Sequence, residues 1–228
     1  MSINFHLTAE FKFTQPLHFG TGLSHLGVAD RTIGLDAAGH PVLRGEAVKG
    51  AIRGSAERLI RWLLTPQSVQ NEQEDHSLPP PGSLYRIFRG DGDPRSGPAY
   101  RFDTPLYLDG GQLQQIAATR IDHHTGVAAN QSLRVLQSWT PGARFRITIR
   151  GFQGDWDQPA HRDYLDLTLL VAALVCADSA GGRKGAGHGS LEISALHSPQ
   201  LTLPNPGDLA QIEALKLHLL SQEVAPNA

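Results

Sequence analysis

The chain has 228 residues, of which 40% are hydrophobic and 18% are charged, with a formal net charge of −2. The length fits one large domain or one domain with insertions, and the overall charge alone does not point to a nucleic-acid partner. No stretch approaches the roughly 18 apolar residues that a membrane span needs. A lone cysteine, Cys176, excludes an intrachain disulfide, and its apolar neighbours predict a buried thiol.

The N-terminal third of the chain combines strand and helix patterns. Apolar and polar residues alternate over residues 3–13, which predicts one or two half-buried strands. Residues 41–43 form a candidate short strand, and apolar positions at helical spacing over Glu46–Leu64 predict an amphipathic helix. Residues 66–83 are polar and proline-rich, so we expect an exposed, flexible loop there.

The middle of the chain has short strand patterns. Leu84–Phe88 and Tyr100–Leu108 are candidate strands on either side of a polar turn segment. Residues 112–142 contain two arms that end at a proline-glycine pair, which predicts a long β-hairpin projecting from the body. Arg144–Phe152 alternates strictly, with apolar residues on one face and arginines on the other, and this predicts a half-buried strand.

The last third of the chain completes an α+β pattern. Tyr164–Ala177 predicts an apolar core helix, Leu191–Ile193 a strand, and Leu209–Leu220 a short helix. The order of all these elements predicts a ferredoxin-like (RRM-like) βαββαβ core with insertions. We expect a single domain over residues 1–198, interrupted by the hairpin, and an extension over residues 199–228.

A glycine-rich segment, Gly181–Gly189, follows the predicted core helix and reads GGRKGAGHG. Glycine permits positive φ and lets backbone N–H groups approach an anion closely, while Arg183 and Lys184 add positive charge. The spacing matches neither a P-loop nor a dinucleotide-binding turn. Two interpretations stand: a cradle for a polyanion, or a flexible hairpin loop whose charges face solvent.

A second cationic segment lies at the start of the predicted N-terminal helix. Lys49 and Arg53 are one helical turn apart on one face, with Arg44 at the N-terminal end. A glycine inside a helix costs about 0.8–1.0 kcal/mol relative to alanine, so Gly50 and Gly54 need a physical reason. The close approach of a phosphate backbone would supply one. The alternative is a solvated face whose cations pair with glutamates of the same helix.

Several short motifs follow one another in a characteristic order: LHFGTG, GVADRTIGLD, LRGEAVKGAIRG, IFRG, RIDHHTGVA and GGRKGAGHG. Over about residues 1–195, this ordered set resembles the RAMP superfamily, and most of all the backbone subunits of type III CRISPR effector complexes. The resemblance implies a guide CRISPR RNA as ligand and a projecting thumb hairpin that wedges between bases. It also implies stacking along the guide with copies of itself or related backbone subunits, beside other effector subunits.

Carried over by position, the resemblance places RNA contacts on the cationic helix, the glycine-rich segment and the thumb. The implied RNA-binding residues are Arg44, Lys49, Arg53, Gly181, Gly182, Arg183, Lys184, Gly185, Gly187, His188, His123 and Thr125. Contacts of this kind position the RNA without reading its sequence. Small and apolar residues at 125–128 suit insertion between bases.

The resemblance further implies that one aspartate cuts complementary target RNA with the help of a divalent metal. Asp30 occupies that place, and Asp36 matches an accompanying acidic position. A carboxylate beside RNA can hold Mg²⁺ or Mn²⁺ transiently or help remove a proton from a ribose 2′-hydroxyl. From the residues alone, a loop aspartate is more often a turn residue. The pair Asp91 and Asp93 likewise favours a tight turn over a calcium site.

Three functions therefore remain open. The leading one is a guide-binding backbone subunit that acts as a divalent-metal-dependent endoribonuclease within the complex, through Asp30. The second is a noncatalytic RNA-binding scaffold. The third is a stand-alone guide-processing ribonuclease, in which His123 and His124 would act as acid and base. We expect a cytoplasmic protein with no membrane partner, because the sequence has no signal or spanning pattern.

Overall fold

The computed structural model describes residues 5–20, 30, 32–64, 82–88, 100–119, 121–122, 124–130, 132–151, 161–182 and 187–223. Its elements in chain order are β1 (Phe5–Phe13), α1 (Gly45–Leu64), α2 (Gly82–Phe88), β2 (Tyr100–Phe102), β3 (Leu106–Asp109), β4 (Leu113–Ala118), β5 (Arg134–Trp139), β6 (Arg144–Gly151), α3 (Arg162–Val175), β7 (Leu191–His197) and α4 (Leu209–Glu223). Most of the predicted loop 66–83, and the pair Asp91 and Asp93, lie outside the described residues.

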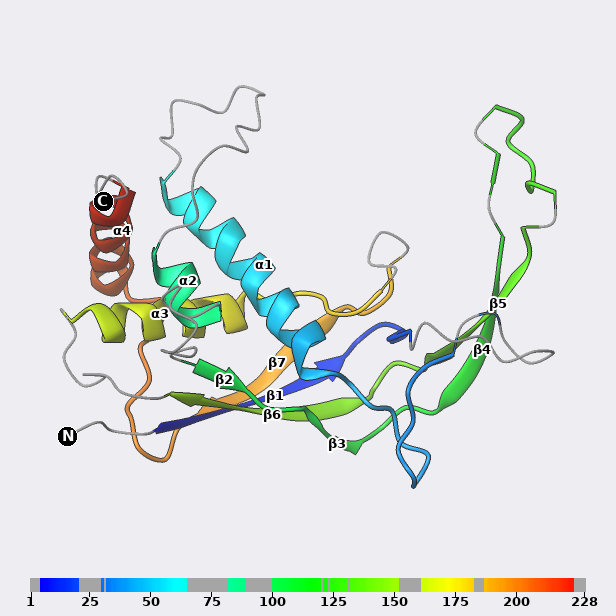
Figure 1. Ribbon diagram of the computed structural model, residues 1–228, viewed down its shortest axis with the longest axis horizontal. Helices are drawn as coiled ribbons and strands as arrows, with labels where there is room; N and C mark the ends of the chain where they lie inside the picture. Colours follow the sequence, from blue (N-terminus) through cyan, green and yellow to red (C-terminus); the bar gives the residue numbers. More distant parts are fainter. Residues whose placement is uncertain are drawn as a thin grey trace.

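The central sheet has the strand order β2-β6-β1-β7, and β3 also pairs with β6. All of these pairings are antiparallel. In chain order, β1, α1, β2, β6, α3 and β7 give a βαββαβ succession with β1 and β6 at the centre, so the predicted ferredoxin-like fold is confirmed. The helices cover one face of this sheet (Figure 1).

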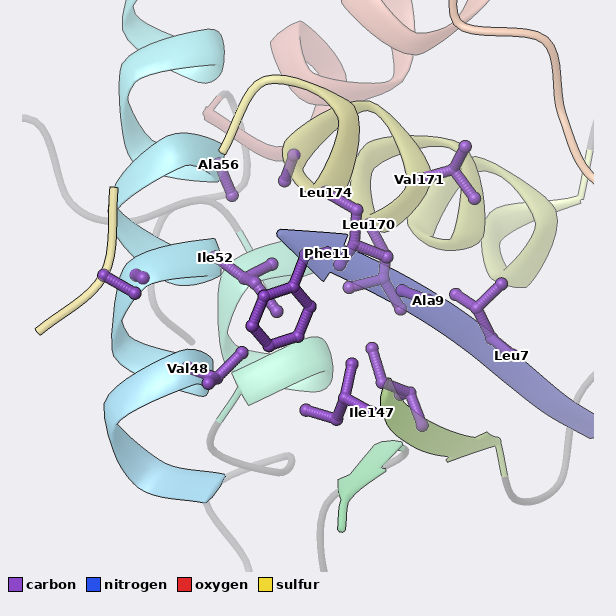
Figure 2. Packing of buried hydrophobic residues seen from close by; sticks show 14 of the residues in the cluster. Leu7, Ala9, Phe11, Val48, Ile52, Ala56, Ile147, Leu170, Val171 and Leu174 are labelled. Atoms are coloured by element: carbon purple, nitrogen blue, oxygen red, sulfur yellow. The ribbon is translucent and has the colours of Figure 1, made fainter. Parts of the chain in front are cut away.

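Alternating apolar residues on the two central strands build the floor of the core. Phe145, Ile147 and Ile149 of β6 are fully buried, while the residues that alternate with them, Arg144, Arg146, Thr148 and Arg150, face the uncovered side of the sheet. Side chains of α1 and α3 pack onto this floor at Val48, Ile52, Ala56, Leu170, Val171 and Leu174 (Figure 2). Burial of this apolar surface fixes α1 on the sheet and thereby sets where its N-terminal end lies.

A buried ion pair joins the remaining helices. Arg86 of α2 donates to Asp166 of α3 from Nε at 2.6 Å and from a terminal nitrogen at 2.8 Å. His218 of α4 lies 3.8 Å from the same carboxylate. Burial alone would raise the pKa of Asp166, but hydrogen bonds from His218 and Arg86 bring it below its ordinary value. The cluster therefore fastens α2 and α4 to α3.

The strands β4 and β5 form a separate two-stranded antiparallel sheet that extends away from the body (Figure 1). The predicted projecting hairpin, the thumb, is thus confirmed. At its tip, the carboxylate of Asp122 accepts hydrogen bonds from the N–H groups of His124 and Thr125, which closes a turn. At its base, the Trp139 indole is buried and donates to the Gly110 carbonyl oxygen at 2.9 Å.

Four local predictions are wrong. The candidate strand at residues 41–43 is reduced to an isolated bridge between Leu35 and Pro41. Leu84–Phe88 belongs to the helix α2, because Leu84, Ile87 and Phe88 are buried at helical spacing in a segment too short to be distinguished from a strand by pattern. The predicted strand Tyr100–Leu108 is divided into β2 and β3 around Pro105, which has no N–H to donate to a ladder. Cys176 is exposed because it caps α3, beyond the helix's last buried turn.

Candidate nucleic-acid interface

A pocket of about 470 Å³ lies beside the N-terminal half of α1. Arg44, Ala47 and Gly50 line it from the start of α1, and Gly181 and Gly182 line it from the glycine-rich segment. Its remaining lining comes from residues 19–20, 34–35, 42 and 51. Among the described lining residues, Arg44 carries the single charge. Two predicted RNA-binding segments, far apart in the sequence, therefore meet at one surface.

The ends of the glycine-rich segment are shaped by the protein's own packing. Gly181 has a φ of +96°, and a Cβ there would come within 3.0 Å of the His18 carbonyl oxygen. Gly189 has a φ of +76°, and a Cβ there would overlap the Ala180 carbonyl group. Gly182 is exposed, and its N–H donates to the His18 carbonyl oxygen at 2.9 Å. Positive φ and close contact thus account for the glycines at 181 and 189.

The other predicted members of this segment lie between Gly182 and Gly189. Gly187 is exposed with a φ of +78°, and His188 is half-buried. Arg183, Lys184 and Gly185 lie outside the described residues.

The three predicted cations at the start of α1 have different neighbours. Arg44 is exposed and has no ion-pair partner in the described part of the chain. Lys49 Nζ lies 5.7 Å from the centre of the Phe102 ring, and burial, with a smaller effect of Arg53, lowers the pKa of Lys49. Arg53 Nε donates to Glu57 at 2.7 Å. The glycine-rich segment therefore meets α1 at Arg44 and Gly50, whereas Lys49 and Arg53 are outside the described lining of the pocket.

The two glycines inside α1 have open space beside them. A Cβ built on Gly50 or on Gly54 would meet no described atom within 4 Å. Packing among the described residues therefore does not require glycine at either position, although glycine costs a helix about 0.8–1.0 kcal/mol relative to alanine.

Asp30 is attached to β5 of the thumb, near the end of the β4–β5 ladder that faces the tip. Its N–H donates to the Val135 carbonyl oxygen at 2.8 Å, and its Oδ2 accepts the Val135 N–H at 2.7 Å. The residue is exposed. Asp36 instead forms a turn: its Oδ1 accepts from the N–H groups of Ala38 and His40, and the bond from His40 is the main reason that its pKa is lowered.

A profile of the RAMP superfamily matches residues 10–192 of the sequence. The chain belongs to the RAMP superfamily. The family resemblance of the sequence motifs is thereby confirmed. No curated protein matches this RAMP sequence significantly.

Solved structures of CRISPR complexes contain chains with the same fold as this RAMP protein. One, from the type III-B Cmr-β complex in its apo state, has a TM-score of 0.56 and 11% identity over 86% of this chain and 98% of that chain. A chain of Cmr-β bound to cognate target RNA has a TM-score of 0.54 and 15% identity, and the match covers 86% of this chain and 60% of that chain. A chain of a type IV-B CRISPR complex has a TM-score of 0.56 and 15% identity over 90% of this chain and 96% of that chain.

The thumb of this RAMP protein carries exposed small and apolar residues at its tip. Thr125 and Val127 are exposed, Val127 by 61%, and Gly126 has a φ of +70° with open space around it. His123 lies outside the described residues. Within the described ranges, no three histidine, cysteine or acidic side chains gather as a metal cluster would require. Of the helices in those ranges, none combines the length and hydropathy of a bilayer span.

His18 is a residue that the sequence did not single out. It is only 4% exposed, and its Nδ1 lies 2.7 Å from the Gln137 carbonyl oxygen at the base of the thumb. It belongs to the motif LHFGTG, but no ligand-type spacing marks it, so its two partners are found only in the three-dimensional structure. In the RAMP fold described here, it lies where the glycine-rich segment and the thumb come together.

Proposed function

We propose that this RAMP protein is a backbone subunit of a type III CRISPR ribonucleoprotein, which binds guide CRISPR RNA and cuts complementary target RNA at Asp30. The observation that carries the proposal is the shared pocket, where Arg44 and the N-terminal half of α1 meet Gly181 and Gly182. Copies of the chain, or related backbone subunits, stack along the same guide beside the other effector subunits.

The chemistry of the pocket suits a sugar-phosphate backbone. Arg44 is free of competing acidic partners within the described residues, and a guanidinium binds phosphate oxygens in a bidentate way. The N-terminal end of α1 adds the favourable potential of a helix dipole. Gly50, which has open space beside it, lets a ribose or phosphate approach the backbone closely, opposite Gly181 and Gly182 in the pocket lining. Phosphate contacts hold the guide in place, while base pairing within the RNA supplies sequence specificity.

The remaining predicted contacts extend this surface. Lys49 and Arg53 continue the positive potential along α1, and Gly54 leaves room beside them. Guide contacts on the glycine-rich segment include Arg183, Lys184, Gly185, Gly187 and His188. At the thumb, His123 and Thr125 contact RNA where the exposed tip inserts between bases.

Asp30 fits a transient divalent metal. Mg²⁺ is commonly held by one or two carboxylates together with water and substrate phosphates, and Asp30 offers one exposed carboxylate anchored by Val135. A bound Mg²⁺ or Mn²⁺ would supply charge stabilisation at the phosphoryl oxygens of the target RNA. The protein's own contribution is to hold this carboxylate against β5 of the thumb.

The decisive test is Asp30→Asn in the complex assembled with its guide. Asparagine keeps an oxygen that can accept the Val135 N–H but removes the negative charge, so the local structure is preserved. We expect target cleavage with Mg²⁺ or Mn²⁺ to fall at least about a hundredfold, as for loss of a metal-ion catalyst, with guide binding unchanged. The matched control His124→Ala should cut normally.

The same experiment separates the alternatives. A wild-type complex that binds target RNA but leaves it intact in both metals would favour the noncatalytic scaffold. Cutting of precursor repeat RNA by the isolated chain, lost in His124→Ala or His123→Ala, would favour the guide-processing ribonuclease. Undiminished metal-dependent cutting by Asp30→Asn would exclude Asp30 as the catalytic residue.

A further inference from the structure

The outer edge of β5 is held by residues that precede α1. Leu17 and Trp139 exchange two backbone hydrogen bonds of 2.8 Å. Farther along the strand, Asp30 and Val135 form the pair of bonds of 2.8 and 2.7 Å that attach the proposed catalytic carboxylate. Val135 and Trp139 are four residues apart on β5. Because backbone N–H and C=O groups repeat their direction every second residue, those of both residues point to the same side, away from β4. The thumb base and Asp30 are thus parts of one hydrogen-bonded edge.

His18 bonds to the middle of this edge. Its Nδ1 lies 2.7 Å from the carbonyl oxygen of Gln137, the residue between Val135 and Trp139 in that register. Because a carbonyl oxygen can only accept, Nδ1 must carry the hydrogen. The side chain is 4% exposed, so water does not readily replace this bond.

The backbone of His18 bonds in the other direction, to the glycine-rich segment. Its carbonyl oxygen accepts the Gly182 N–H at 2.9 Å, and Gly181 packs directly against the same carbonyl. Phe19 and Gly20, the residues that follow, line the pocket together with Gly181 and Gly182. One buried residue therefore contacts both the proposed guide cradle and the strand that carries Asp30.

We propose that His18 is a positioning residue that couples the two sites: RNA held at Gly181 and Gly182 fixes His18, and His18 in turn fixes the β5 edge to which Asp30 is attached. This inference rests on the proposed guide binding. The contacts are already formed without RNA, and on this proposal RNA in the cradle stabilises them and so favours cutting by guide-loaded protein. The connection runs through four named contacts: Gly182 to His18, His18 to Gln137, Gln137 along β5 to Val135, and Val135 to Asp30.

Two substitutions separate the hydrogen bond from the bulk of the ring. His18→Asn places an amide N–H near the position of Nδ1 and should preserve the bond to Gln137. His18→Leu fills a similar volume without a donor. Should His18→Leu fail to fold, His18→Gln replaces it, because its donor lies one bond farther from the backbone.

The readout is hydrogen–deuterium exchange of the full chain, with and without a saturating single-stranded oligouridine RNA. In the wild type we expect RNA to slow exchange about fivefold or more both at residues 178–191 and at residues 134–139. In His18→Leu the glycine-rich segment should still be protected by RNA, while the protection at β5 is lost. His18→Asn should restore it, which a purely structural role of the ring would not produce.

The outcomes distinguish this inference from the proposed function. If RNA slows exchange at neither segment in the wild type, both the proposed guide binding at the pocket and the proposed coupling are wrong. Two results would overturn only the coupling and leave guide binding intact. In the first, RNA protects the glycine-rich segment and slows exchange at β5 equally in the wild type and in His18→Leu. In the second, RNA protects the glycine-rich segment but does not slow exchange at β5 in either protein. Equal protection would mean that RNA reaches the thumb directly.

Discussion

Lys49 lies over the ring of Phe102, with Nζ 5.7 Å from the ring centre, and this contact holds the cation on the β2 side of α1. Arg44 lies at the pocket instead, next to the glycine-rich segment. Arg53 is engaged by Glu57 at 2.7 Å. Three cations that the sequence places along one short segment are therefore in three different electrostatic situations, and they should contribute unequally to RNA binding.

Arg44→Ala should weaken binding of single-stranded RNA about tenfold or more, because a hydrogen bond to a charged group is worth about 1.5–3 kcal/mol. Lys49→Ala and Arg53→Ala should have smaller effects, since Phe102 and Glu57 already engage these side chains. Fluorescence anisotropy over a series of salt concentrations measures the RNA affinity and its dependence on salt. Loss of one phosphate contact should lower the slope of log K against log salt by about 0.7 for Arg44→Ala. Equal losses at the three positions would contradict this ranking.

Gly50→Ala should stabilise the free protein and weaken RNA binding at the same time. Nothing described lies within 4 Å of the added Cβ, so helix propensity should raise the free energy of unfolding by up to about 1 kcal/mol. The methyl group would nevertheless enter the pocket that Gly50 lines. Urea unfolding and RNA titration of the same preparation test the two halves of this prediction.

Gly54→Ala is the matched control for that experiment. It also has open space, but it lies outside the described lining of the pocket, so it should stabilise the chain with a smaller effect on RNA affinity. If Gly50→Ala bound RNA as tightly as the wild type, the pocket beside α1 would not be the guide site.

The ion pair of Arg86 and Asp166 should stabilise the folded chain and should make its stability depend on pH. Breaking a buried ion pair costs about 3–5 kcal/mol, so Asp166→Asn should be strongly destabilised. The exposed pair of Arg146 and Glu10 is the control, and Arg146→Gln should cost about 0–1 kcal/mol.

The pH dependence of this pair follows from the direction of the Asp166 pKa shift. Its pKa in the folded chain lies below the ordinary value of 3.8, so the unfolded chain takes up the proton first as the pH falls. The stabilisation is therefore fully present above about pH 3.8 and is lost as the pH falls through the folded-state pKa. Urea unfolding at a series of pH values should show this loss in the wild type. If Asp166→Asn lost as much stability between neutral and low pH as the wild type does, the loss would be due to other carboxylates.

Val127→Asp should disable the thumb tip without unfolding it. Val127 is 61% exposed, and exposed substitutions usually change stability by less than about 0.5 kcal/mol. A charged tip should no longer separate stacked bases, so 2-aminopurine placed in the guide of the assembled complex should stay quenched. The control is Leu106→Asp, which changes an equally exposed apolar residue on β3. This variant should give the same 2-aminopurine fluorescence as the wild type. Bright 2-aminopurine in Val127→Asp would show that the tip does not unstack bases.

Long elements with strong periodicity were predictable from the sequence. The strict alternation in β6 and the helical spacing in α1 each reflect burial of one face against the same core, so local pattern and tertiary packing agree. The short helix α2 was missed because seven residues contain too few turns to define a period. Cys176 was misplaced because apolar neighbours in the sequence do not show where a helix leaves the core.

The candidate site was predictable only in its parts. Arg44, Gly50 and Gly181 stood out by residue type, but their meeting at one pocket depends on how α1 and α3 pack on the sheet. The division between Arg44 and Lys49 likewise follows from the ring of Phe102, which belongs to another strand. His18 lies in the motif LHFGTG, but the motif did not show its role, since that role comes from two hydrogen-bond partners distant in sequence.

The exposed thiol at the end of α3 has a practical use. Because Cys176 is the chain's single cysteine and is accessible in the folded protein, a maleimide dye would attach at one defined place on every copy. Energy transfer between donor- and acceptor-labelled copies would then report the spacing of neighbours along an RNA strand. The spacing could therefore be measured without an engineered cysteine.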